Sequence, residues 1–232
     1  MKRLHTQQEI NDALALVDAW KNPNLPERQW EVIKNERLLV YQNRALEVAP
    51  YKAALAALGY AKLDNTPETK ILDIGAGSGI YSEIIRRSGF QWSYAACDYS
   101  EAFKEFSQIK YPELNYEVQD ATALTYADNQ FDFVLHGCCL IHIRDWQDAI
   151  AEAARISKKY ILFHRTPMVN EPENQYWIKE AYGVPCFDIW FSQDKFTKEL
   201  EKNQLKIVHT ETVFQTDQPD GYGHFSILCE KI

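Results

Sequence analysis

The sequence lacks the features of a membrane protein, a disulfide-rich secreted protein or a nucleic-acid binder. No apolar run approaches the roughly 18 residues of a membrane span, and the first nine residues have no apolar signal-peptide core. The five cysteines are odd in number and not paired in spacing, which is typical of free thiols in a reducing compartment. With 33 acidic and 25 basic residues, the net charge of -8 opposes non-specific binding to nucleic acid. We therefore expect a cytoplasmic protein with no membrane or nucleic-acid partner.

The chain of 232 residues fits one α/β domain with a modest extension. Its first part predicts helices: one over Ile10–Trp20, a second from about residue 28 to residue 48, and a continuation over Tyr51–Leu58. Pro50 is expected to interrupt this pattern, and Gly59 is expected to follow the last helix. Residues 1–60 thus form an expected N-terminal helical cap on a single domain covering residues 1–232.

After residue 60, short apolar runs alternate with helical patterns, which predicts a doubly wound, mostly parallel sheet. The expected strands are Lys70–Ile74, Gln91–Cys97, Asn115–Gln119, Phe131–Leu135, Tyr160–His164, Lys206–Gln215 and His224–Ile232. The expected helices are Ile80–Arg87, Glu101–Lys110, Asp145–Ile156 and a helix from Ser192 to about Asn203. The turn at residues 216–221 is too short for a crossover, so we expect the last strand to be antiparallel. An aromatic insertion at residues 167–191 is expected to form a lid.

The strongest motif is the segment from Leu72 to Ile80, which has the sequence LDIGAGSGI and lies between an expected strand and an expected helix. Its glycines allow a tight turn and a close approach of the backbone to a ligand, and the helix N-terminus directs N–H groups at an anionic group. The spacing is G-x-G-x-G rather than the dinucleotide pattern G-x-G-x-x-G. Asp73 would repel a diphosphate but can accept from an ammonium. The motif therefore favours the zwitterionic end of an amino acid as ligand.

Two more acids follow neighbouring strands. Asp98 ends the second strand, 23 residues after Gly75, where a carboxylate can bind the two hydroxyls of a ribose. Asp120 ends the third strand, where it can accept from an adenine amino group. Taken singly, Asp98 could be a cap near Ser100 and Asp120 a turn residue. Their joint placement with Asp73 favours a nucleoside ligand.

On these motifs the chain resembles the class I S-adenosylmethionine (SAM)-dependent methyltransferases over about residues 68–166. The resemblance implies a Rossmann-like, doubly wound, seven-stranded sheet of order 3-2-1-4-5-7-6 with strand 7 antiparallel. It also implies SAM as cofactor or substrate. The residues that it assigns to the cofactor are Asp73, Gly75, Gly77, Gly79, Asp98, Tyr99, Asp120, Ala121 and His136. The Pro-Pro motif of amino-methylating nucleic-acid enzymes is absent after the fourth strand, so a nucleobase acceptor is not favoured.

Candidate catalytic residues follow the fourth and fifth strands, at residues 136–139 and 164–167. His136 is a candidate general base, although lining the SAM pocket is the simpler interpretation. Cys139 and its neighbour Cys138 are candidate nucleophiles or, more simply, small packing residues. His142 begins the next loop, where capping is the simpler role, and His164 is expected to be a satisfied strand-end histidine. No His and Cys spacing indicates a metal site.

The expected lid supplies further candidates. Tyr176 and Trp190 could each place an aromatic face against the sulfonium, and Asn174 lies two residues before Tyr176. From the N-terminal cap, Tyr41 and Arg44 could close over SAM, with Arg44 pairing its carboxylate. Plain lid packing and a solvated helix arginine are the alternative interpretations.

Three functions remain open at this point. The first is methyl transfer to a small-molecule acceptor. The second uses SAM alone, as in azetidine-2-carboxylate synthases, which share the fold and form the four-membered amino acid and methylthioadenosine. The third is a non-catalytic SAM-binding subunit. The sequence identifies neither an acceptor nor an oligomeric state, and a homodimer remains open.

Overall fold

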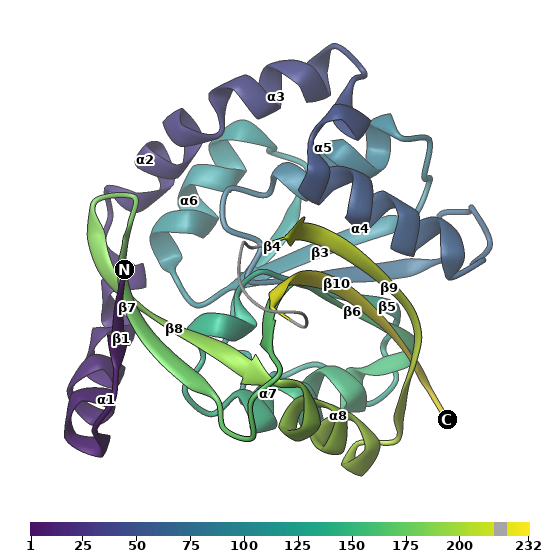
Figure 1. Ribbon diagram of the computed structural model, residues 1–232. Coiled ribbons are helices and arrows are strands. Elements are labelled where there is room, and N and C mark those ends of the chain that lie inside the picture. The colour runs from purple at the N-terminus through teal and green to yellow at the C-terminus, as the bar shows by residue number, and fades with distance from the viewer. Residues whose placement is uncertain (216–221) are drawn as a thin grey trace.

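A computed structural model describes residues 1–215 and 222–232 (Figure 1). A sheet with helices on both faces forms its centre. Seven strands lie side by side in the order β4-β3-β2-β5-β6-β10-β9. Their bounds are β2 Lys70–Ile74, β3 Ser93–Asp98, β4 Asn115–Val118, β5 Phe131–Gly137, β6 Ser157–Val169, β9 Leu205–Gln215 and β10 Gly223–Lys231.

The pairing of these seven strands agrees with the order that the resemblance implies. The pairs from β4 to β6 are all parallel, whereas β10 runs antiparallel to both β6 and β9. The expected turn at residues 216–221 lies outside the described residues. The carboxyl ends of β2, β3 and β5 therefore meet at one edge, which is where doubly wound sheets bind ligands.

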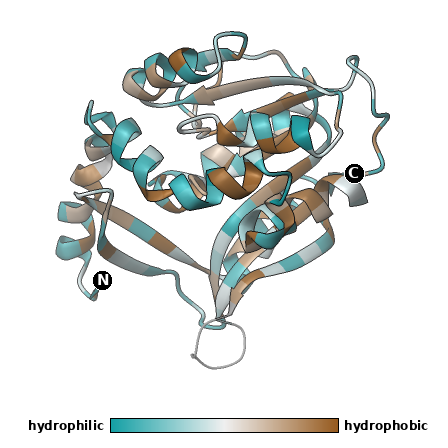
Figure 2. Ribbon diagram, turned by 90° about the horizontal axis from the view of Figure 1, so that it is seen from above, coloured by the Kyte–Doolittle hydropathy of each residue, from teal (hydrophilic) through white to brown (hydrophobic). Residues whose placement is uncertain are grey.

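Alternation along the strands divides the core into two layers. Leu72, Val134 and Ile161 belong to one cluster with α7 (Trp146–Ile156) and α8 (Gln193–Lys202). The residues next to them along the strands, such as Ile71, Phe133 and Leu162, belong to a second cluster with α4 (Ala49–Tyr60) and α5 (Ile80–Arg87). Figure 2 shows that the helices carry both hydrophilic and hydrophobic colours, as helices packed on a sheet do.

Three strands were not expected, so the prediction of seven strands was incomplete. Residues 167–191, expected as a lid, form most of a β-hairpin, β7 (Gln175–Ala181) and β8 (Val184–Ser192). The short strand β1 (Lys2–Leu4) pairs with β7. Met168 and Val169 of β6 pair in parallel with the end of β8. In Figure 1 this unit stands beside the central sheet. It forms because β6 continues well past the predicted end of the fifth strand.

The N-terminal cap is helical but more divided than predicted. Pro50 lies in the first turn of α4, where its missing N–H costs nothing, and α4 then continues through Gly59. The expected single helix from residue 28 to residue 48 is interrupted and becomes three elements. The elements before α4 are α1 Gln7–Leu14, η1 Ala15–Lys21, α2 Leu25–Val32, α3 Lys34–Tyr41 and η2 Ala45–Glu47.

The remaining helix, α6 (Glu101–Lys110), has the predicted bounds, and the short η3 (Leu140–His142) follows β5. Ser100 occupies the N-cap position of α6 without a side-chain capping bond, and its own N–H donates to Asp98 instead. Across the described residues, no helix is both long enough and apolar enough to cross a membrane.

Candidate active site

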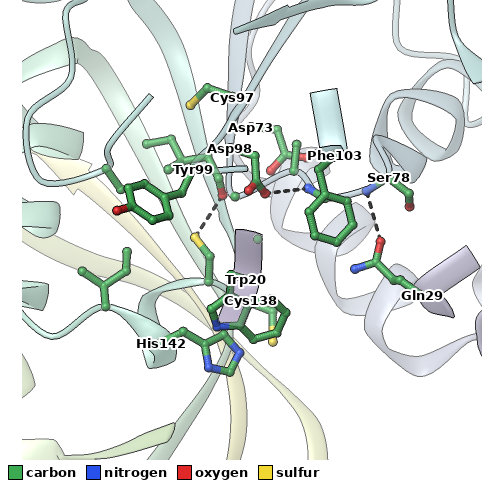
Figure 3. Close-up of a pocket in the computed structure, with 18 of the residues that line it drawn as sticks. Trp20, Gln29, Asp73, Ser78, Cys97, Asp98, Tyr99, Phe103, Cys138 and His142 are labelled. Atoms are coloured by element: carbon green, nitrogen blue, oxygen red, sulfur yellow. Dashed lines mark hydrogen bonds between the residues drawn. The ribbon is translucent and has the colours of Figure 1, made fainter. Parts of the chain in front are cut away.

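A cavity of about 480 Å³ lies at the carboxyl ends of the parallel strands (Figure 3). Its volume is in the range of small-molecule sites. The segments after β2, β3, β4 and β5, together with Arg165 of β6, form its base, and residues of α2, α3 and α4 close it from the N-terminal side. We call the lining from the segments after β3 and β4 the nucleoside end of the cavity. We call the lining from the N-terminal helices, Arg165 of β6 and the β7–β8 turn the acceptor end.

The glycine loop between β2 and α5 lines the cavity as the sequence predicted. Gly75 has a φ of 70°, and a Cβ placed on it would lie 2.3 Å from the Cβ of Cys139. Neither the conformation nor the space allows a side chain there. The carbonyl of Gly77 accepts from Tyr116 Oη at 2.8 Å and Ser107 Oγ at 3.0 Å. These bonds hold the loop against β4 and α6. Gly79 is the N-cap of α5 and does not itself line the cavity.

Two carboxylates line the cavity beside this loop, Asp73 fully buried and Asp98 half-buried. Asp98 accepts from the backbone N–H groups of Gly77 and Ser100, both at 3.0 Å. Asp73 accepts from Tyr94 through one oxygen, while its Oδ1 has no partner among the described residues. Burial raises the pKa of Asp98 to about 6 and that of Asp73 to about 7. A cationic ligand would restore the favourable environment that these carboxylates lose on burial.

The other end of the predicted nucleoside site is also in place. Tyr99, Asp120 and Ala121 line the cavity, as does Phe103 of α6, which the sequence analysis did not single out. Asp120 Oδ1 accepts from the N–H and the hydroxyl of Thr122 at 2.9 Å and 2.7 Å. Asp120 therefore forms a turn as well as lining the cavity, so both interpretations of this residue describe part of its role.

His136 and Cys139 lie together beneath the loop. The Nδ1 of His136 is 2.9 Å from Cys139 Sγ, and the thiol also donates to the carbonyl of Ile74. His136 is buried and does not line the cavity, and burial lowers its pKa to about 3. Burial raises the pKa of the Cys139 thiol. A neutral buried imidazole and an un-ionised thiol are poorly suited to act as base and nucleophile.

Besides Gly79 and His136, five more predicted residues do not line the cavity. Arg44 pairs with Glu47 on the surface, and Tyr41 is exposed beneath the guanidinium of Arg87. On the hairpin, Tyr176 stacks on Phe187, Trp190 packs against Trp177 and His224, and Asn174 Oδ1 accepts from the N–H of Ser192. The expectation that Tyr176 or Trp190 faces a sulfonium does not fit these positions. The hairpin packs these rings against one another and against β10.

His142, at the end of η3, lines the cavity instead. Its Nδ1 is 2.8 Å from the carbonyl oxygen of Phe187 and 3.0 Å from Asp188 Oδ1. A carbonyl can only accept, so in neutral His142 the proton sits on Nδ1 and Nε2 keeps its lone pair. Burial acts to raise the pKa of Asp188, but His142 and Lys179 lower it overall. The carboxylate is therefore charged and can stabilise a His142 imidazolium.

Asp188 also belongs to a group of three side chains that could hold a metal ion. It is the one such group among the described residues. The ligand atoms of His142, Cys186 and Asp188 lie within 4.8 Å of one another. However, the Lys179 ammonium forms an ion pair with Asp188, so the positive charge that a metal would supply is already present. This arrangement fits a histidine–carboxylate pair better than a metal centre.

Sequence reasoning missed most of the cavity wall opposite the nucleoside end. These residues are Trp20, Gln29, Glu36, Tyr51, Tyr81, Lys179 and Tyr182. Trp20 packs against the ring of His142, with 4.5 Å between the ring centroids. Arg165 also lines this end; the sequence placed it at a strand end but gave it no role. Apart from the strand-end position of Arg165, no local pattern marks these residues.

Comparisons with known proteins agree with the cofactor site. A family model described as a methyltransferase domain matches residues 72–161, the segment that runs from the glycine loop through β6. The magnesium protoporphyrin IX methyltransferase of Synechocystis, solved with bound S-adenosylhomocysteine, has a TM-score of 0.61 at 16% identity and covers 94% of this chain and 99% of that one. The chain therefore matches a methyltransferase domain over residues 72–161 and has the fold of SAM-dependent methyltransferases.

Other methyltransferases are similar over smaller parts. A demethylmenaquinone methyltransferase of Renibacterium salmoninarum is 33% identical over 92 residues, which are 40% of this chain and 38% of that protein. A SAM-dependent methyltransferase of Methanosarcina mazei has a TM-score of 0.58 at 18% identity, covering 75% of this chain and 97% of that one. The chain spans about two fifths of the length of the first of these relatives.

SAM is the methyl donor of such methyltransferases, and the cavity fits it. Asp98 offers a carboxylate at the end of β3, and the glycine loop leaves room for a backbone-sized group. The unpartnered Oδ1 of Asp73 fits a molecule that brings an ammonium and a sulfonium. SAM supplies an electrophilic methyl group when bound.

Proposed function

We propose that this protein is a methyltransferase that moves the methyl group of SAM to a small-molecule acceptor. The observation that carries the proposal is the single cavity in which a SAM site and a histidine–carboxylate pair lie together. Asp98 and the glycine loop form the first, and His142 with Asp188 forms the second. A protein that only bound SAM would have no need of the histidine–carboxylate pair.

The residues on the acceptor side have separable roles. His142 takes a proton from an acceptor hydroxyl or amine through Nε2, and Asp188 stabilises the charge that develops on the ring. Trp20 and the carbonyl of Phe187 fix the orientation of the ring. The helices that close the cavity hold the acceptor in line with the methyl group and exclude water.

The acceptor is a small molecule because the cavity is enclosed on several sides and has a volume of about 480 Å³. The similar proteins include demethylmenaquinone methyltransferases and a ubiquinone/menaquinone biosynthesis C-methyltransferase of Desulfotalea psychrophila, 24% identical over 143 residues. A quinone-like acceptor is thus one class to test. The charged lining of the acceptor end gives a reason to test polar acids as well.

The test is incubation of the protein with SAM, alone and with pooled candidate acceptors, followed by mass spectrometry of the nucleoside products. We expect S-adenosylhomocysteine only when an acceptor is present. Asp98→Ala should abolish its formation, while Asp12→Ala, at an exposed residue of α1, should not. Methylthioadenosine formed without an acceptor would instead show cyclisation of SAM, and intact SAM under all conditions would show a binding protein.

A further inference from the structure

Arg165 is the least satisfied charged side chain on the acceptor side of the cavity. It lines the cavity, its Nε is buried without a hydrogen-bond partner, and no ion pair or hydrogen bond of its side chain is found within residues 1–215 and 222–232. A buried donor of a charged group that stays unpaired lowers stability. Other pocket cations differ, since Lys179 is paired with Asp188.

The backbone at Arg165 is also in an unfavourable conformation. Thr166 pairs with Phe225 and Phe163 with Ile227, so two residues of β6 face the single residue between them on β10. This β-bulge places Arg165 at a φ of 56°, a left-handed conformation that costs energy for a residue with a side chain. Bulges redirect side chains next to active sites, and here the redirected side chain is the one that lines the cavity.

Two other residues at the same end share this conformation. Cys138, after β5, has a φ of 61°, and Tyr182, in the β7–β8 turn, has a φ of 52°. Both line the cavity. Cys138 raises the pKa of Arg165, burial opposes that rise, and Tyr81, Tyr182 and Glu36 add to it, so the guanidinium is charged. Glu36 contributes a carboxylate nearby but forms no ion pair with Arg165, so the guanidinium is left as a site for a small anion.

We propose that Arg165 binds a carboxylate group, and that this group belongs to the methyl acceptor, which is a small organic acid. The proposal rests on the function proposed above. A guanidinium presents two parallel N–H donors that match a carboxylate. Glu36, whose carboxylate accepts from Tyr51 at 2.9 Å, lines the same end and leaves it with little net positive charge. That balance suits a monoanion better than a dianionic phosphate.

The methionine end of SAM is the other source of a carboxylate in this cavity. Among the groups with the largest electrostatic effect on Arg165, none is an acid predicted for the SAM site. Its partners come instead from α3, α5, the end of β5 and the β7–β8 turn. These partners place Arg165 on the acceptor side of the cavity. The experiment below distinguishes a carboxylate of the acceptor from the carboxylate of SAM.

The experiment measures binding by calorimetry in saturating S-adenosylhomocysteine. The probes are hydroxy- and aminobenzoates and short hydroxy and amino acids, each paired with its primary amide. We expect at least one acid to bind more than tenfold tighter than its amide. Arg165→Met should abolish this preference, with a loss of about 10- to 100-fold in affinity for the acid, and Arg165→Lys should retain part of it. Both variants need the same backbone conformation as arginine, and thermal melts check their folding.

Binding of SAM itself is measured for the same variants, with the surface variant Arg44→Met as control. We expect the affinity for SAM to change by less than about threefold, because the guanidinium does not contact the cofactor. A loss of more than tenfold would assign the carboxylate to SAM and overturn the proposal. Amides that bind as well as acids throughout, or a preference that survives in Arg165→Met, would overturn it too. Failure of the wild-type protein to bind SAM would contradict the proposed function instead.

Discussion

At the scale of the residue, Asp98 has two tasks that its position makes compatible. Its carboxylate accepts from the amides of Gly77 and Ser100, which holds the glycine loop in place, and it lines the cavity. Asp120 also lines the cavity but accepts twice from Thr122. The two acids, alike in the sequence, should therefore differ in their importance for the cofactor.

Asp98→Ala should weaken SAM binding by about 2–4 kcal/mol, the scale of two lost charge-assisted hydrogen bonds. Asp120→Ala should weaken it by less, because most of the role of Asp120 is within its own turn. Calorimetric titration measures both. Equal losses for the two variants would contradict the assignment of Asp98 to the ribose.

The two raised pKa values predict how SAM binding depends on pH. Asp98, with a pKa of about 6, and Asp73, with a pKa of about 7, are partly protonated in the free protein near pH 6. A cationic ligand favours their charged forms, so affinity should rise with pH from about 5.5 to 8 and then level off. In the free protein, the same raised values lower the free energy of unfolding as pH increases from about 4 to about 7. In Asp73→Asn the upper part of the affinity rise should disappear; an unchanged profile would show that Asp73 does not titrate there.

His142 should control the rate of transfer without controlling cofactor binding. His142→Gln removes the base but keeps a side chain of similar reach, so kcat should fall by about 10²–10⁴-fold with an unchanged dissociation constant for SAM. His209→Gln, at a histidine that pairs with Glu211 on β9, serves as control. Full activity of His142→Gln would remove His142 from the mechanism.

At the scale of the element, local signals predicted the parts of the fold that local forces determine. The bounds of β2, α5 and α6 agree with the sequence because glycine, serine and proline mark their ends. The β1–β7–β8 unit could not be predicted in this way. β1 has three residues, and β8 is buried along nearly its whole length, so neither shows alternation. Their pairing depends on contacts between distant segments.

The glycine loop gives a prediction at this scale. Gly75→Ala should abolish SAM binding and destabilise the protein, because the new Cβ meets Cys139 at 2.3 Å in a left-handed conformation. Gly89→Ala is the matched control: its φ is 90°, but nothing lies within 4 Å of the new Cβ. It should lower the melting temperature without affecting SAM binding. If Gly75→Ala bound SAM normally, the loop would not be the cofactor turn.

At the scale of the whole molecule, the two ends of the cavity differ in how far the sequence reveals them. The predicted nucleoside end follows consecutive strands, so the spacing of Asp73, Asp98 and Asp120 was sufficient to predict that they line one cavity. The acceptor end brings together α2, α3, the end of β6 and the hairpin. Arg165 and His142 acquire their roles only there, from a bulge and from a contact with β8. Tyr176 and Trp190 were misplaced for the same reason, since the path of the hairpin is not a local property.

The most direct test of methyl transfer uses SAM that carries deuterium in its methyl group, with an accepted acid or quinone as second substrate. The account predicts that the three deuterium atoms appear in the acceptor, in equal amount to S-adenosylhomocysteine, and that the Asp98→Ala variant forms neither. Deuterium retained in methylthioadenosine, formed whether or not an acceptor is present, would contradict it.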